Sequence, residues 1–244
     1  MTKEKINELV AKYGSPLYVF QKEEFVKNYL HFEECFKNLY PKYQLAYSYK
    51  TNYTPVICEI VKQLGGYAEV VSDMEYNVAK RLGYNNEKII YNGPYKTELS
   101  IEHLLAGGIL NIDNIEEVKK VCTIAEAHAE KQLKVGIRVN INIGQHFISR
   151  FGIVSDSSDL DLAFYLLKEN GVKVEGLHCH IGQSRTIQAW KNRAKVMLTL
   201  ADKYFQPEPP KYLNLGSGMF GTMDPEFAEQ FEKVPSPPCP SWKE

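Results

Sequence analysis

The 244-residue sequence has no long apolar run, no paired cysteines and no surplus of either charge. No apolar run approaches the ~18 residues that a membrane-spanning helix needs. The opening residues, MTKEKINELVAKYG, read as an amphipathic helix and not as a basic and then apolar export signal, so we expect a cytoplasmic protein. The formal net charge of -1 argues against nucleic acid or an anionic membrane as a partner.

The cysteines are too scattered to cross-link the fold or to form a zinc knuckle. There are five, an odd number, and none lies in a C-x-x-C pair, so we expect reduced thiols. His178 and His180 share one face of a predicted strand, a spacing that can bind a metal. Because no third ligand is identifiable, we favour two histidines stacked inside the fold.

Short runs rich in β-branched and aromatic residues alternate with helical runs through most of the chain. Seven such runs are predicted as strands, at residues 44–50, 67–71, 88–91, 108–112, 134–141, 172–180 and 211–215. Strands that alternate with helices predict a parallel sheet. The dinucleotide fingerprint G-x-G-x-x-G is absent after the first strand, which favours a barrel over an open sheet. We therefore predict a (β/α)8 TIM-type barrel that lacks one strand.

The predicted barrel occupies residues 41–233. Residues 1–40 form a lead-in of helix, strand and helix, in which PLYVF (16–20) is predicted as a strand of an otherwise absent β domain. Residues 234–244 are predicted to be irregular, because clustered prolines exclude a helix interior or a central strand. A missing eighth strand leaves two sheet edges unpaired, so we expect a fragment, or a tail or partner chain that covers the gap.

Unusual polar residues fall at the carboxyl ends of the predicted strands, where barrels of this type hold their active sites. They are Lys50, Glu69, Ser72, Asn92, Gly93, Arg138, His180, Gly216, Ser217 and Gly218. Each has a plain structural alternative, such as a snorkelling lysine or a simple tight turn. Together they suggest pyridoxal phosphate (PLP) bound as a lysine imine, with the backbone N–H groups of small residues binding its phosphate. An aldolase that uses a lysine imine without a cofactor is an open alternative.

Five segments carry a resemblance to a known family. They are AYSYKTN, AEVVSDMEY, KIIYNGPYK, GLHCHIGQS and LNLGSGMFG, in this order between residue 14 and about residue 225. They resemble the Y-A-x-K-A-N, D-V-x-S-x-x-E, I-x-Y-x-x-P-x-K, G-x-H-x-H-I-G-S and L-D-x-G-G-G-x-G segments of the alanine-racemase-fold (fold type III) PLP-dependent amino-acid decarboxylases. Among these, the sequence is most similar to diaminopimelate decarboxylase.

The resemblance implies a set of roles. Lys50 would form the imine with PLP and His180 would stack on the cofactor ring, so these two are the implied catalytic residues. Glu69 and Glu75 would organise the region around the lysine, and Arg138 would lie near the ring oxygen. The cofactor-binding residues that it implies are Lys50, Glu69, Arg138, His180, Ser184, Gly216, Ser217 and Gly218. A lysine is nucleophilic only when neutral, so we expect Lys50 inside the barrel rim.

The sequence departs from the family pattern in four places. Gln183 stands at the serine position of H-I-G-S, and Ser217 replaces the second glycine of the turn. The loop INIGQHFIS is short for a diaminopimelate decarboxylase, and the E-P-G-R, C-E-x-x-D and late-tyrosine segments are absent.

The function that the resemblance implies is decarboxylation of an amino acid by a homodimer. The substrate would be diaminopimelate or a basic amino acid such as ornithine, lysine or arginine. The alternatives are a non-catalytic PLP-binding or regulatory homologue and an amino-acid racemase of the same fold.

Overall fold

The computed structural model describes residues 1–144, 149–182 and 186–218. The chain divides into two compact units, Met1–Tyr43 and Gln44–Glu244. In the first unit, helices α1 (Lys3–Tyr13) and α2 (Lys22–Lys37) are joined by an irregular segment. Among the described residues, no helix is both long enough and apolar enough to cross a bilayer.

The predicted strand at residues 16–20 is wrong, because the structure assigns no strand there. A strand needs a hydrogen-bonded neighbour, and no pairing in the described chain involves this segment. Aromatic side chains of α2 pack within their own unit. The rings of Phe32 and Phe36 lie 5.0 Å apart, and Phe36 stacks on Tyr43 at 4.6 Å.

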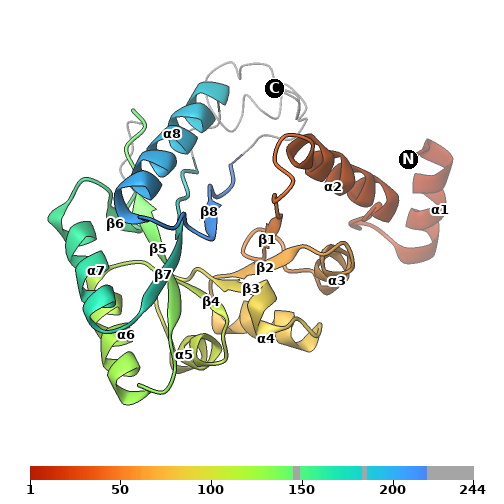
Figure 1. The fold of residues 1–244 in the computed structure, drawn as a ribbon. Coiled ribbons are helices and arrows are strands. Elements are labelled where there is room, and N and C mark those ends of the chain that lie inside the picture. Colours follow the sequence, from red (N-terminus) through yellow and green to blue (C-terminus); the bar gives the residue numbers. More distant parts are fainter. Residues whose placement is uncertain (145–148, 183–185, 219–244) are drawn as a thin grey trace. The chain divides into compact units, whose positions relative to one another are not determined.

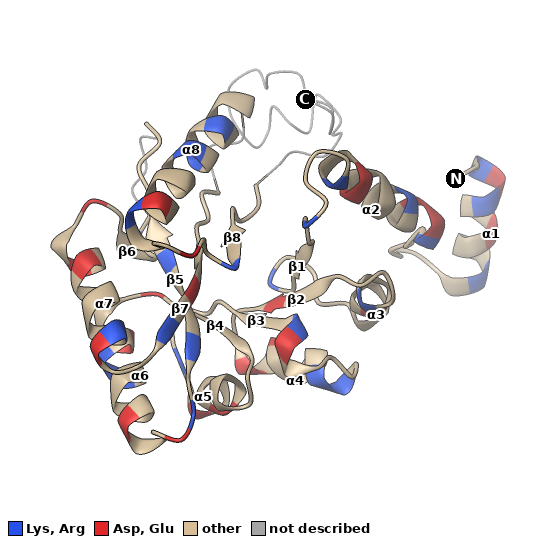
Figure 2. Ribbon diagram, in the orientation of Figure 1, with Lys and Arg blue, Asp and Glu red and all other residues tan. Residues whose placement is uncertain are grey.

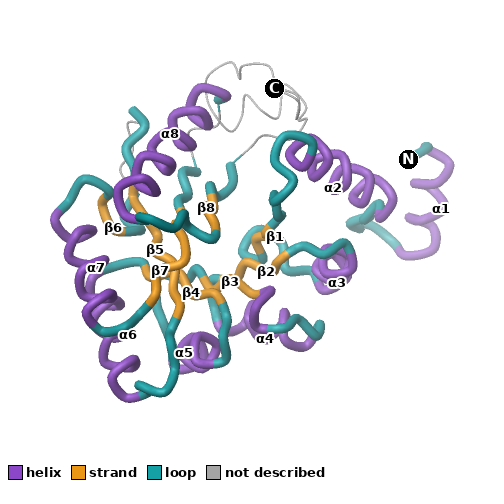
Figure 3. The backbone as a smooth tube through the Cα atoms, viewed as in Figure 1, coloured by secondary structure: helices purple, strands orange, loops and turns teal. Residues whose placement is uncertain are grey.

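The second unit contains the seven predicted strands, all parallel and neighbouring one another in chain order (Figures 1 and 3). They are β1 (Ala46–Ser48), β2 (Tyr67–Val70), β3 (Ile89–Tyr91), β4 (Ile109–Ile112), β5 (Lys134–Asn140), β7 (Lys173–His178) and β8 (Tyr212–Asn214). A two-residue strand, β6 (Ile153–Val154), pairs with the end of β5. The predicted incomplete parallel barrel is thus confirmed.

Helices cover the outside of the sheet (Figure 3). They are α3 (Pro55–Gln63), α4 (Asp73–Arg81), α5 (Glu98–Leu105), α6 (Ile115–Ala127), α7 (Ser158–Glu169) and α8 (Ile187–Tyr204), with a 3-10 turn η1 (Asn86–Lys88) before β3. Asn114 caps α6, since the Glu117 N–H donates to Asn114 Oδ1 at 3.0 Å. Both signs of charge occur along helices such as α2 and α6 (Figure 2).

The sheet curves enough for strands far apart in its order to touch through their side chains. The Tyr212 hydroxyl on β8 donates to Asn111 Oδ1 on β4 at 2.8 Å. Asn214 Nδ2, also on β8, donates to Glu69 Oε2 on β2 at 3.4 Å. In the described ranges no backbone pairing joins β1 to β8, so these interior contacts span the barrel where the backbone ladder does not.

Candidate active site

Lys50 lies on a turn just beyond β1. The turn is closed by Thr51, whose N–H and hydroxyl both donate to the Ser48 carbonyl, at 3.2 and 2.7 Å. Tyr49 is fully buried in a cluster with side chains of β2, α3 and α4, whereas Lys50 is exposed. The expectation that the rim encloses Lys50 is therefore wrong for this structure, although the charge of Lys50 acts on buried Glu75 and His178.

The two acidic residues near this turn are buried. Glu69 on β2 is 8% exposed and accepts the hydrogen bond from Asn214. Glu75 in the first turn of α4 accepts from the Val71 N–H at 2.8 Å, and its own N–H donates to Ser72 Oγ at 3.4 Å. Burial raises the pKa of Glu75, while the Val71 hydrogen bond and the positive charge of Lys50 oppose that rise. The contacts show a capping role for Glu75, and the attraction places it within electrostatic range of Lys50.

A chain of buried hydrogen bonds crosses the barrel interior and ends on His178. Asn111 Nδ2 donates to Asn92 Oδ1 at 2.8 Å. Asn92 Nδ2 then lies 3.1 Å from His178 Nε2 and can only donate to it. His178 is therefore neutral at Nε2, and burial holds its pKa well below the usual value. The described residues contain no group of three or more side chains suited to a metal ion.

Arg138 on β5 has the acid that a buried guanidinium requires. It is 7% exposed, and its Nη1 donates to Asp113 Oδ1 at 3.3 Å. A second buried pair lies beside it, in which Lys96 Nζ is 3.0 Å from Glu117 Oε2. Glu117 Oε2 also accepts from the Asp113 N–H at 2.8 Å, so the two pairs form one charged cluster. Sequence reasoning missed Asp113, although its place just after a predicted strand was a usable signal.

The small-residue turn after β8 lies against the loop after β7. Gly216 and Gly218 have positive φ angles of 70° and 108°. A Cβ on Gly216 would lie 2.3 Å from the Cys179 carbonyl oxygen, so only glycine lets these backbones approach so closely. The Ser217 N–H donates to His180 Nδ1 at 3.4 Å, which brings the predicted ring-stacking histidine to the predicted phosphate turn.

The Gly216 N–H is already used within the turn, since it donates to Asn214 Oδ1 at 2.8 Å. This bond is an Asx-type turn, which fixes the shape of the loop. Ser184, one of the implied cofactor-binding residues, and Gln183 beside it lie outside the described residues. The structure thus brings His180 together with Gly216 and Ser217 and places Arg138 and Glu69 inside the same barrel.

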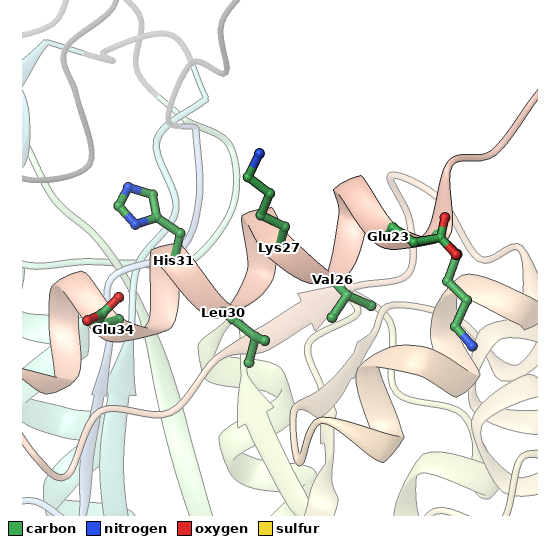
Figure 4. Close-up of a pocket in the computed structure, with 7 residues that line it drawn as sticks. Glu23, Val26, Lys27, Leu30, His31 and Glu34 are labelled. Carbon is green, nitrogen blue, oxygen red and sulfur yellow. The ribbon is translucent and has the colours of Figure 1, made fainter. Parts of the chain in front are cut away.

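A shallow groove in the N-terminal unit is a different kind of feature. Its lining residues are Lys22, Glu23, Val26, Lys27, Leu30, His31 and Glu34. Figure 4 shows Lys27 and His31 on one side of the helix and Val26 and Leu30 on another. Because all of them belong to α2, they form the surface of one helix, and we assign no chemistry to it.

Fold and site together define an α/β barrel domain whose strand ends hold a lysine, a histidine, buried acids and a tight glycine turn. The chain belongs to the pyridoxal-dependent decarboxylase family, whose pyridoxal binding domain matches residues 23–236. This confirms the resemblance seen in the five segments, including the pyridoxal cofactor of the family.

The relatives include diaminopimelate decarboxylases. That of Aquifex aeolicus is 28% identical over 245 residues, covering 95% of this chain and 56% of the relative. That of Methanocaldococcus jannaschii is 29% identical, covering 87% and 52%. The crystal structure of diaminopimelate decarboxylase from M. jannaschii matches with a TM-score of 0.75 and 27% identity, covering 87% of this chain and 54% of that one. The chain spans about half the length of the curated relatives it matches.

Proposed function

We propose that this chain is the cofactor-binding part of a PLP-dependent amino-acid decarboxylase, with diaminopimelate as the favoured substrate. The substrate rests on the relatives that match most of the chain, which are diaminopimelate decarboxylases at 28% and 29% identity. Decarboxylases of lysine and ornithine share the fold at about 20% identity, which supports the architecture alone. The observation that carries the proposal is the contact between His180 and the turn at Ser217, at the strand ends of a parallel barrel.

The residues present fit the cofactor. The backbone at Gly216 is packed too closely for a Cβ, which suits a turn that must approach a phosphate. His180 is half-buried beside that turn, where an imidazole can lie against a flat ring. Bound PLP supplies an electron sink for the electron pair left when carbon dioxide departs. Arg138 is fixed by Asp113, so its guanidinium is held in place before any ligand arrives.

Lys50 is the residue that would hold the cofactor's aldehyde. Its exposed amine is accessible, and Glu75 lies within electrostatic range of it. We also propose a homodimer, as the resemblance implies. Sedimentation of the purified chain should give twice the mass of 28.0 kDa, and a monomer at working concentrations would contradict this part of the proposal.

Mass and absorbance measurements test the cofactor assignment. Protein mixed with PLP should turn yellow, and borohydride reduction should bleach it and add the cofactor's mass at Lys50. Lys50→Ala should lose the imine absorbance. Lys191→Ala, which removes an exposed lysine on α8, should keep it. Full imine absorbance in the Lys50→Ala protein would contradict the assignment.

A non-catalytic PLP-binding homologue is the second candidate, and the exposed position of Lys50 favours it. An amine attacks an aldehyde only when it is neutral, and removal from water favours that form, so chemistry at this residue would require desolvation. Carbon dioxide release from diaminopimelate, lysine, ornithine and arginine separates the two. Carbon dioxide release from any one of them supports the decarboxylase, and no release from any of the four supports the binding homologue.

A further inference from the structure

Arg193 on α8 is the largest fully buried side chain in the described part of the chain, with 0% of its surface exposed. Its guanidinium lies over the Trp190 ring, 4.1 Å from the centroid, so the side chain is held from one face. Burial lowers the pKa of Arg193, and a guanidinium keeps its charge even so. A buried charge of this kind must be compensated by nearby acceptors.

The acceptors are main-chain carbonyls from two separate loops. Nη1 donates to the carbonyl oxygens of Leu215 and Ser217, at 2.8 and 3.1 Å. Nη2 donates to the Ile181 carbonyl at 3.0 Å. Leu215 and Ser217 belong to the turn after β8, and Ile181 to the loop after β7. The planar guanidinium of Arg193 therefore links the two loops that form the proposed phosphate subsite.

These hydrogen bonds also fix which way the peptide groups face. In a trans peptide the C=O and the N–H of the next residue point in opposite directions. The peptide bonds after Ile181 and Ser217 are trans, since the described cis bonds lie elsewhere. Carbonyls drawn toward Arg193 thus turn the N–H groups of the residues that follow them away from the guanidinium. Backbone N–H groups that face away from the carbonyl side of a loop are what an anion site requires.

The close packing of the loops supports the same conclusion. A Cβ on Gly216 would lie 2.3 Å from the Cys179 carbonyl oxygen, and one on Gly218 would lie 3.1 Å from the Ile181 carbonyl oxygen, so the two loops approach closely. The carbonyl oxygens of Leu215, Ser217 and Ile181, gathered at one guanidinium, repel one another unless a cation lies among them. Arg193 supplies that cation from behind the loops.

We propose that Arg193 is a positioning residue for the cofactor phosphate. Its hydrogen bonds hold carbonyl groups on one side of the loops after β7 and β8, so that backbone N–H groups face the other side. This inference rests on the proposed function, because it assumes that the anion is the phosphate of PLP. It assigns Arg193 no contact with the cofactor.

The test compares two ligands that differ only in the phosphate. The affinities of the full chain for PLP and for pyridoxal are measured by absorbance titration in the wild type, Arg193→Met, Arg193→Lys and Lys195→Met. Lys195 is an exposed residue of the same helix, so Lys195→Met controls for the loss of one positive charge. Circular dichroism of each cofactor-free protein reports whether it is folded.

In the wild type we expect PLP to bind more tightly than pyridoxal. Arg193→Met should weaken PLP binding by about tenfold or more, because each lost hydrogen bond between the guanidinium and a loop carbonyl is worth about one such step in holding the loops in shape. Pyridoxal affinity should stay nearly unchanged. Arg193→Lys should restore part of the difference, because lysine keeps the charge but not the fork. Lys195→Met should behave as the wild type. If Arg193→Met does not fold, the test uses the ratio of PLP affinity to pyridoxal affinity in Arg193→Lys alone. We expect that ratio to be lower than in the wild type.

Two results would overturn the inference in distinguishable ways. If folded Arg193 variants keep the wild-type preference for PLP, or lose both ligands equally, Arg193 does not act through the phosphate subsite and the proposed function stands. If the wild type itself shows no preference for PLP over pyridoxal, the phosphate subsite does not exist and the proposed function falls with it.

Discussion

Substitution of Gly216 by alanine should reveal how closely the β7 and β8 loops approach. Gly216 has a φ of 70°, and an added Cβ would lie 2.3 Å from the Cys179 carbonyl oxygen and 2.9 Å from the His180 Cα. Both neighbours are backbone atoms, so no rotamer change relieves the contact. The loops must separate or the sheet must shift.

Gly171, in the turn after α7, is a matched control for the backbone conformation. Its φ is 69°, and an added Cβ there would meet nothing within 4 Å. An alanine held in the left-handed region costs about 1–2 kcal/mol. Forcing a methyl group into a packed site adds about 1–3 kcal/mol. We therefore expect Gly171→Ala to lose about 1–2 kcal/mol of unfolding free energy and Gly216→Ala to lose about 2–5 kcal/mol.

Urea denaturation of the cofactor-free proteins, followed by circular dichroism, measures both losses. A PLP titration of the folded variants gives a second readout, in which Gly216→Ala should weaken binding and Gly171→Ala should not. Equal losses of unfolding free energy in the two variants would refute the close approach of the loops. Unchanged PLP affinity in Gly216→Ala would show that this turn does not hold the phosphate.

Two further predictions concern buried titratable groups. Lys96→Met should cost about 3–5 kcal/mol of unfolding free energy because it leaves Glu117 buried without its partner, and the double variant Lys96→Met/Glu117→Gln should cost less than the two single losses combined. Lys119→Met breaks the exposed pair with Glu116 and should cost far less; a similar loss in both would contradict the buried pairing. Burial lowers the pKa of His103 from 6.5 to about 4, so its neutral form stabilises the fold above pH 6.5 and that contribution is lost as the pH falls toward 4. His103→Gln should flatten the stability profile in this window by up to about 3 kcal/mol, measured by urea denaturation at each pH, and an unchanged slope would contradict the assignment.

Local patterns in the sequence were enough to predict the parallel barrel. Alternating apolar runs located all seven main strands, since burial on a sheet face imposes a short period that the residues display directly. The N-cap of α6 at Asn114 is likewise local, because its partner Glu117 is three residues away. The prediction of a strand at residues 16–20 was wrong because an apolar run becomes a strand only when another strand pairs with it.

The site was only partly predictable. The sequence placed Arg138 among the polar residues of the predicted strands, but the identity of its partner Asp113 required the register of β4 and β5. Lys50 was correctly placed at the end of β1, yet its exposure depends on the turn that follows. Arg193 stood inside an ordinary helical pattern and gave no local signal of its contacts with the two loops.

By itself the sequence determined the order and type of the elements, the polar residues at the strand ends and the family, because these depend on neighbours along the chain. Only the tertiary structure decided which of those residues meet. Glu69 and Asn214 are separated by 145 positions and touch because the sheet curves. The contacts of Arg193 with the carbonyls of Ile181 and Leu215 likewise exist only once β7 and β8 pair. Contacts of this range depend on the curvature and register of the whole sheet, which no short stretch of residues encodes.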